Sequence, residues 1–118
     1  MNNGTNGAYP QVGLFSPPTI MLNGAGSTAG NTATTVIATQ GVGNRIYITS
    51  LQFGNSSGST VVVLLNDTAG SNFIVPAGGG NNPPLEVPLI MPVNTGLTFT
   101  PSLAVTTTFC NAQGYIGT

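Results

Sequence analysis

The sequence is nearly without charged side chains. Only 3% of its 118 residues are Asp, Glu, Lys or Arg, against roughly 25% in an average soluble domain. The single basic residue is Arg45, and the acidic residues are Asp67 and Glu86. Binding to a phosphate backbone requires several Lys or Arg side chains, because it is driven by the release of counterions. Nucleic acids and anionic membrane surfaces are therefore not expected as partners.

Histidine is absent, and cysteine occurs once, as Cys110. Ser-His-Asp and Cys-His nucleophilic sites therefore cannot be built within one chain. Transition metals need clusters of His or Cys, and calcium needs several carboxylates, so we expect neither a metal nor a cofactor. A lone cysteine cannot form an intrachain disulfide. The apolar neighbours of Cys110 predict a buried, inert thiol.

The charged residues that remain form no evident active site. Asp67 lies in a predicted turn, and Glu86 lies between two prolines on another segment, so a carboxylate pair is not expected. We expect Asp67 to cap its turn and Glu86 to contact Arg45 or solvent. No catalytic, cofactor-binding or metal-binding residue is assigned, and the protein is not expected to be an enzyme. The least favoured alternative is an enzymatic site at a subunit interface, which would have only these residues, Cys110 and tyrosines.

The sequence shows neither an export signal nor a membrane span. No Lys or Arg precedes an apolar stretch of signal-peptide length, and no window approaches the roughly 20 apolar residues that cross a bilayer. The chain is nevertheless 40% hydrophobic, whereas disordered chains combine low hydrophobicity with high charge. We therefore expect one folded domain with a modest core.

Residues 1–31 are predicted to form an extended, Gly- and Pro-rich N-terminal arm. The glycines and prolines in this segment disfavour both a helix and a central strand. Apolar residues such as Tyr9, Leu14 and Ile20 occur along it, which predicts that the arm docks on its own domain or on a neighbouring subunit. The stretch 24–30 resembles a dinucleotide-binding loop only superficially, because the expected flanking strand and helix are missing.

Residues 32–118 are predicted to form an all-β domain. Short β-branched runs alternate with turn clusters, and no helical period is sustained. The pattern indicates a single antiparallel β-sandwich, jelly-roll-like, with about seven to eight strands. The predicted strands are 32–39, 44–53, 60–66, 71–76, 84–90, 96–100 and 103–110, with 113–117 as a terminal extension.

The second predicted strand contains a break in its alternation. Ile46 and Ile48 share one face, whereas Leu51 and Phe53 have the opposite parity. A bulge or bend near Thr49 and Ser50 would turn all four side chains inward.

Three segments are predicted connections. The stretch 55–59 is interpreted as a hairpin loop, and 66–70 as a turn capped by its own side chains. The stretch 76–80 is interpreted as a crossover between sheets rather than as a binding loop.

The run Val61–Leu65 is apolar at every position. In an antiparallel sheet such a run predicts that both faces are covered, one by the opposite sheet and the other by a further partner. Left bare, it would favour aggregation, so we expect assembly or the arm to protect it.

The order of strands and turns from residue 32 to 117 resembles small β-sandwich proteins of tailed bacteriophage particles. The resemblance rests on 45–51, the loop 55–59, the strand 60–65, the Pro-Ala-Gly-Gly-Gly stretch 76–80 and the segment 85–89. It is a resemblance of strand and turn style rather than of a diagnostic motif. Its nearest role is that of capsid decoration, or cement, proteins.

The resemblance implies a structural protein on the outer surface of the virion. Such a subunit binds the major capsid protein, commonly as a homotrimer at local three-fold positions, and stabilises contacts between capsid subunits. It brings no catalytic residues. The arm lies outside the matched region, so the alternative is a phage tail or fibre component that acts as an adhesive, glycan-binding module. In that case exposed aromatics such as Tyr9, Tyr47 and Tyr115 would stack on sugars.

Overall fold

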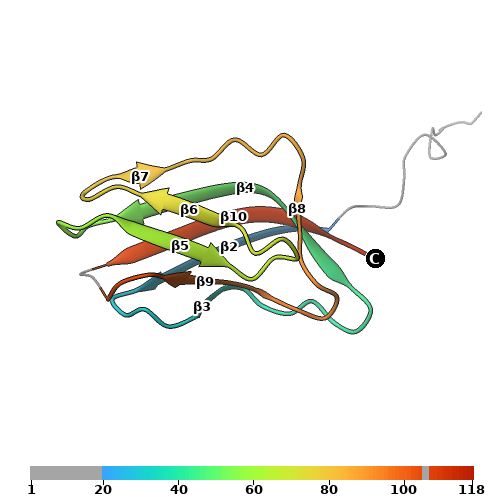
Figure 1. Ribbon diagram of the computed structural model, residues 1–118. Helices are drawn as coiled ribbons and strands as arrows, with labels where there is room; N and C mark the ends of the chain where they lie inside the picture. The colour runs from blue at the N-terminus through green and yellow to red at the C-terminus, as the bar shows by residue number, and fades with distance from the viewer. Residues whose placement is uncertain (1–19, 105–106) are drawn as a thin grey trace, which may run out of the picture.

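The structure is a computed structural model that describes residues 20–104 and 107–118. Within these residues the chain forms nine strands and no helix, arranged as two antiparallel sheets packed face to face (Figure 1). The predicted all-β, antiparallel β-sandwich is confirmed. The described part of the chain has no helix long and apolar enough to cross a membrane.

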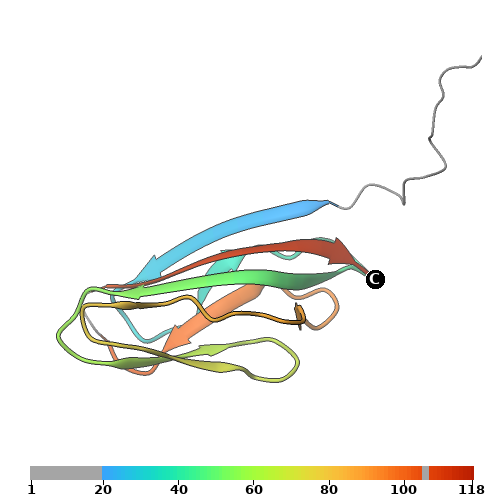
Figure 2. The same ribbon diagram turned by 90° about the horizontal axis from the view of Figure 1, so that it is seen from above.

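One sheet has five strands and the other has four. The five-stranded sheet has the order β2 (Met21–Thr28), β10 (Thr108–Gly117), β4 (Arg45–Asn55) and β7 (Gly80–Asn81), and β8 (Leu89–Ile90) also pairs with β4. The four-stranded sheet has the order β3 (Thr34–Ile37), β9 (Leu97–Pro101), β5 (Val61–Leu65) and β6 (Asn72–Val75). Figure 2 shows the two layers, with β2, β10 and β4 side by side in one of them.

Strand β2 departs from the prediction that residues 1–31 form an arm outside the sandwich. It pairs along its whole length with β10, from Met21 opposite Tyr115 to Thr28 opposite Thr108. Its inward positions include Gly24 and Gly26, and a Cβ at Gly24 would lie 2.1 Å from the Val36 carbonyl oxygen. The glycines therefore allow β2 to approach β3 closely. Residues 1–19 of the predicted arm lie outside the described residues.

The predicted bulge in the strand 44–53 is confirmed. Ile48 pairs with Gly114 and Ser50 pairs with Gln113, so Thr49 is the extra residue in β4. Ile46, Ile48, Leu51 and Phe53 are all almost fully buried as a result. The bulge brings both halves of a parity-broken strand into the same core.

Other strand boundaries differ from the prediction near the end of the chain. Only Leu89–Ile90 of the predicted strand 84–90 is paired. Pro84 and Pro88 lie in the unpaired part, and proline donates no ladder hydrogen bond. The predicted strand 103–110 and its extension 113–117 instead form the single strand β10, which begins at Thr108. The short strand β7 was not predicted.

The core lies between the two sheets and is mostly apolar. The buried polar residues are Asn55, Ser57, Asp67 and Thr108. The largest fully buried side chains of the core include Phe53 and Phe99. Phe53 also packs on Phe73, with ring centroids 5.2 Å apart. The remaining buried hydrophobic members are Val36, Ile37, Ile46, Ile48, Leu51, Val61, Val63, Leu65, Val75, Met91, Leu97, Cys110 and Ala112.

The loop 55–59 was predicted to be a hairpin loop, and this prediction is wrong: the loop is an arch that connects the two sheets. It leaves β4 in one sheet and enters β5 in the other. The buried Asn55 side chain holds the arch: its Nδ2 donates to the Ser59 carbonyl oxygen at 2.7 Å, and its Oδ1 accepts from the Ser57 hydroxyl at 2.7 Å. A turn-rich sequence between two strands is typical of both connections, so the pairing partners decide between them.

The other two predicted connections are confirmed. The stretch 76–80 carries the chain from β6 in the four-stranded sheet to β7 in the other, with Gly78 at φ +63°. The turn 66–70 joins β5 to β6 and is capped by Asp67, whose carboxylate accepts from the backbone N–H and the hydroxyl of Ser71, both at 2.7 Å.

Candidate binding surfaces

The ionisable residues do not form a common site. Asp67 is buried as the cap of its turn, and Glu86 is exposed on the segment before β8. Arg45 is half-buried, and within residues 20–104 and 107–118 its Nε has no hydrogen-bond partner. Arg45 and Glu86, both within the described residues, form no ion pair. Of the two contacts predicted for Glu86, with Arg45 or with solvent, the structure has the one with solvent. Among the described residues, no three His, Cys, Asp or Glu side chains lie close enough together to hold a metal ion.

Cys110 lies in the core between the sheets. Its side chain is fully buried, and this burial raises the pKa of the thiol from 9.0 to about 12. A thiol with such a pKa carries almost no thiolate at neutral pH, and the thiolate is the reactive form. The predicted buried thiol is confirmed by its position.

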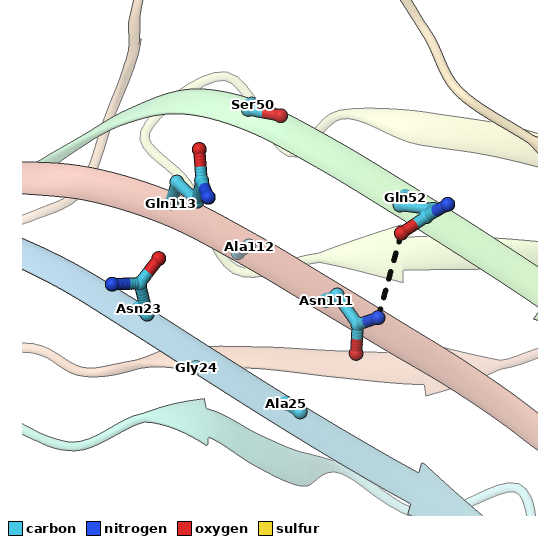
Figure 3. Close-up of a pocket in the computed structure, with 8 residues that line it drawn as sticks. All are labelled: Asn23, Gly24, Ala25, Ser50, Gln52, Asn111, Ala112 and Gln113. Atoms are coloured by element: carbon cyan, nitrogen blue, oxygen red, sulfur yellow. Dashed lines mark hydrogen bonds between the residues drawn. The ribbon is translucent and has the colours of Figure 1, made fainter.

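The outer face of the five-stranded sheet carries a cluster of neutral polar side chains, which we call the amide face. Its members come from three adjacent strands and point to the same side (Figure 3). They line a shallow groove of about 500 Å³, together with the small residues Gly24, Ala25 and Ala112. The members of the amide face are Asn23, Ser50, Gln52, Asn111 and Gln113.

The amide face keeps most of its hydrogen-bonding capacity free. The only hydrogen bond between its side chains joins Asn111 Nδ2 to Gln52 Oε1, at 3.5 Å. Among the described residues the side chains of Asn23, Ser50 and Gln113 have no hydrogen-bond partner. Their donors and acceptors are therefore available to a ligand.

Aromatic rings stand at both ends of the amide face. At one end Tyr47 and Tyr115 are cross-strand partners and stack with ring centroids 5.0 Å apart and planes 9° apart. At the other end Phe109 is 39% exposed. Its ring lies over Gly54, where a Cβ would come within 2.0 Å of the ring. The residue opposite Phe109 in β4 must therefore be glycine for the ring to occupy this position.

The outer face of the four-stranded sheet has a different chemistry. Val62 and Ile74 are cross-strand partners on β5 and β6, and Leu64 lies two residues further along β5. Their side chains are 39%, 64% and 47% exposed, respectively. We call these three residues the apolar patch. The inward residues of the run Val61–Leu65 are buried, but among the described residues nothing covers the outward ones.

The sequence identified part of these surfaces. Tyr47 and Tyr115 were predicted as aromatic contacts and are brought together, whereas Tyr9 lies outside the described residues. The amide face was missed. Alternation of Phe109, Asn111, Gln113 and Tyr115 along one strand could have indicated it, but residues 103–110 and 113–117 were assigned to two separate strands.

The fold and its surfaces together define an all-β sandwich whose two outer faces differ: one carries the uncharged amide face, and the other carries the apolar patch. A search of protein family models, of curated proteins and of solved structures finds no match to this chain.

Proposed function

We propose that the protein is a non-enzymatic structural subunit of a virus particle, a capsid decoration protein that binds the outer capsid surface as a homotrimer and stabilises contacts between major capsid protein subunits. The observation that carries this proposal is the apolar patch. Val62, Leu64 and Ile74 form contiguous exposed apolar surface on a regular sheet, and such surface on a soluble domain marks a contact with another macromolecule.

The composition of the protein favours contacts made by close packing over contacts that depend on long-range electrostatic attraction. With 3% charged residues, the protein has almost no long-range electrostatic field, so its contacts depend little on salt. Hydrophobic burial and neutral hydrogen bonds are the interactions that remain. The resemblance of residues 32–117 to phage decoration proteins supplies the kind of partner.

The proposal is tested on particles produced by the genome that encodes the chain. We expect the protein in purified particles, labelled over the whole capsid surface by a specific antibody in electron microscopy. Particles assembled without the protein should lose their genome at a lower temperature. Absence of the protein from purified particles would overturn the proposal, and label confined to the tail would replace it with the tail or fibre component.

The role of the apolar patch is tested by the triple variant Val62→Ser, Leu64→Ser, Ile74→Ser. The matched control is Val42→Ser, which removes an exposed apolar side chain outside the patch, 94% accessible in the folded chain. We expect the triple variant to stay folded, because all three side chains face solvent, but to bind decoration-free particles at least about tenfold more weakly. Equal binding by the triple and the control variant would show that the patch is not the contact.

A further inference from the structure

We infer that the amide face is a binding site for a linear, uncharged oligosaccharide. The inference goes beyond the proposed function, because the amide face and the apolar patch lie on the outer faces of opposite sheets. One face can hold a particle while the other remains open to solvent.

The hydrogen-bonding groups of the amide face suit a ligand rich in hydroxyl groups. Each Asn or Gln side chain offers both a carbonyl acceptor and two N–H donors, which match neighbouring hydroxyls that each donate and accept. Asn23, Gln113 and Ser50 use none of these groups within the described protein. They lie on three adjacent strands, so the free groups spread across a surface rather than meeting at one point.

The flanking aromatic rings suit the other property of a sugar, its apolar C–H faces. Phe109 is exposed over Gly54 at one end, and the stacked Tyr47 and Tyr115 stand at the other. A second shallow groove extends the amide face past Phe109 and shares Gln52 with it. Exposed aromatic rings beside polar groups provide apolar contact area at little cost in conformational entropy.

The charge and shape of the face define the ligand further. None of the residues lining either groove is charged, which gives no complement to phosphate, sulfate or carboxylate groups. Phe109 and Tyr115 are six residues apart on β10, or about 20 Å along a strand. The two shallow grooves and the aromatic rings beside them therefore form an open surface, which fits several sugar units of a linear chain better than one enclosed monosaccharide.

The experiment uses the full chain and an array of glucose, mannose, galactose and N-acetylglucosamine oligosaccharides of increasing length, each beside a sialylated counterpart. We expect at least one uncharged oligosaccharide to bind with a Kd on the order of 0.1 mM, and its affinity to rise with length. The affinity should change less than about twofold between low and high salt, because no ion pair contributes.

Two variants assign binding to the amide face. The double variant Asn111→Ala, Gln113→Ala and the single variant Phe109→Ala should each weaken binding by about tenfold or more. The matched control is Asn72→Ala, which removes an exposed amide from the outer side of the other sheet. Proton–nitrogen correlation spectra of the wild type, recorded with the bound oligosaccharide, should show shifts at the side-chain amides of Asn111 and Gln113 even if a variant folds poorly.

Three outcomes would overturn the inference. The first is that no uncharged oligosaccharide binds the wild-type protein, and the second is that the sialylated counterparts bind equally well or better. The third is that the double variant changes the mass of the protein in solution but not its sugar binding, which would make the face a contact between copies of the chain. Particle binding through the apolar patch is measured separately, so failure of either proposal leaves the other standing.

Discussion

Deleting a single exposed residue from β4 should lower the free energy of unfolding by very different amounts at two nearby positions. Thr49 is the extra residue of the bulge, and Ile48 and Ser50 already pair with adjacent residues of β10. Deletion of Thr49 therefore restores strict alternation and leaves Ile46, Ile48, Leu51 and Phe53 facing the core. The losses are one exposed hydrogen bond from the Thr49 hydroxyl to the Gln113 carbonyl oxygen and the local bend. We expect a cost of about 1–2 kcal/mol.

Deletion of Gln52, which is also exposed, should be far more damaging. Leu51 and Phe53 would become neighbours and could not both face the core. Phe53 is 1% exposed, so turning it outward costs about 2–3 kcal/mol of transfer free energy, and the vacated cavity raises the total to about 4 kcal/mol or more. Asn55 would also leave its hydrogen-bonded position in the arch.

The assay is urea denaturation of both deletion variants beside the wild type, with the free energy of unfolding as the quantity compared. The Thr49 deletion should retain most of the stability, and the Gln52 deletion should lose a large part of the 5–15 kcal/mol typical of a domain. Equal destabilisation of the two variants, or greater damage from the loss of Thr49, would refute the argument that the bulge only corrects parity.

Three further predictions concern the core and its edges. Thr108→Val should raise the free energy of unfolding by about 1 kcal/mol in urea denaturation, because the buried Thr108 hydroxyl has no partner among the described residues; an unchanged or lower value would show that the hydroxyl is satisfied. Gly24→Ala should cost about 2–3 kcal/mol, since its Cβ would meet the Val36 carbonyl oxygen, whereas Ala25→Ser on the outward side should change little; equal effects would contradict the close approach of β2 to β3. The pKa of Cys110 is about 12 in the folded protein, against an ordinary value of 9.0, so the unfolded chain ionises first and the free energy of unfolding falls as the pH rises above 9. Relative to Cys110→Ala, the fall should be about 2 kcal/mol near pH 10.5. Parallel curves of unfolding free energy against pH for the two proteins would contradict the raised pKa.

The sandwich could be predicted because its strands carry local evidence of burial. The apolar positions of β4, β5 and β9 alternate or cluster in ways that only a sheet accommodates, and the parity change between Ile48 and Leu51 located the bulge. Strand β2 carried the opposite evidence. Gly24 and Gly26 lower strand propensity, yet they are required because β3 passes directly beneath them. The reason for those glycines lies in another strand, and local sequence does not contain it.

The binding surfaces were harder to predict because each is assembled from several strands. Asn23 and Gln113 are far apart in the sequence and become cross-strand partners only through the pairing of β2 with β10. The apolar patch was visible as the all-apolar run Val61–Leu65, but its third member, Ile74, depends on the hairpin register of β5 and β6. Uncharged polar residues also give no compositional contrast in a chain so rich in Asn, Thr and Ser.

The position of β10 has a consequence for how the chain is made. This strand lies between β2 and β4 in the five-stranded sheet, so it joins elements that are synthesised long before it. Until residues 108–117 have left the ribosome, β2 has no partner in its sheet and the inner face of β4 is only partly enclosed. Folding must therefore finish late, through contacts of long sequence separation, which are formed slowly. A nascent chain stalled before residue 108 should be sensitive to protease and require protection from chaperones.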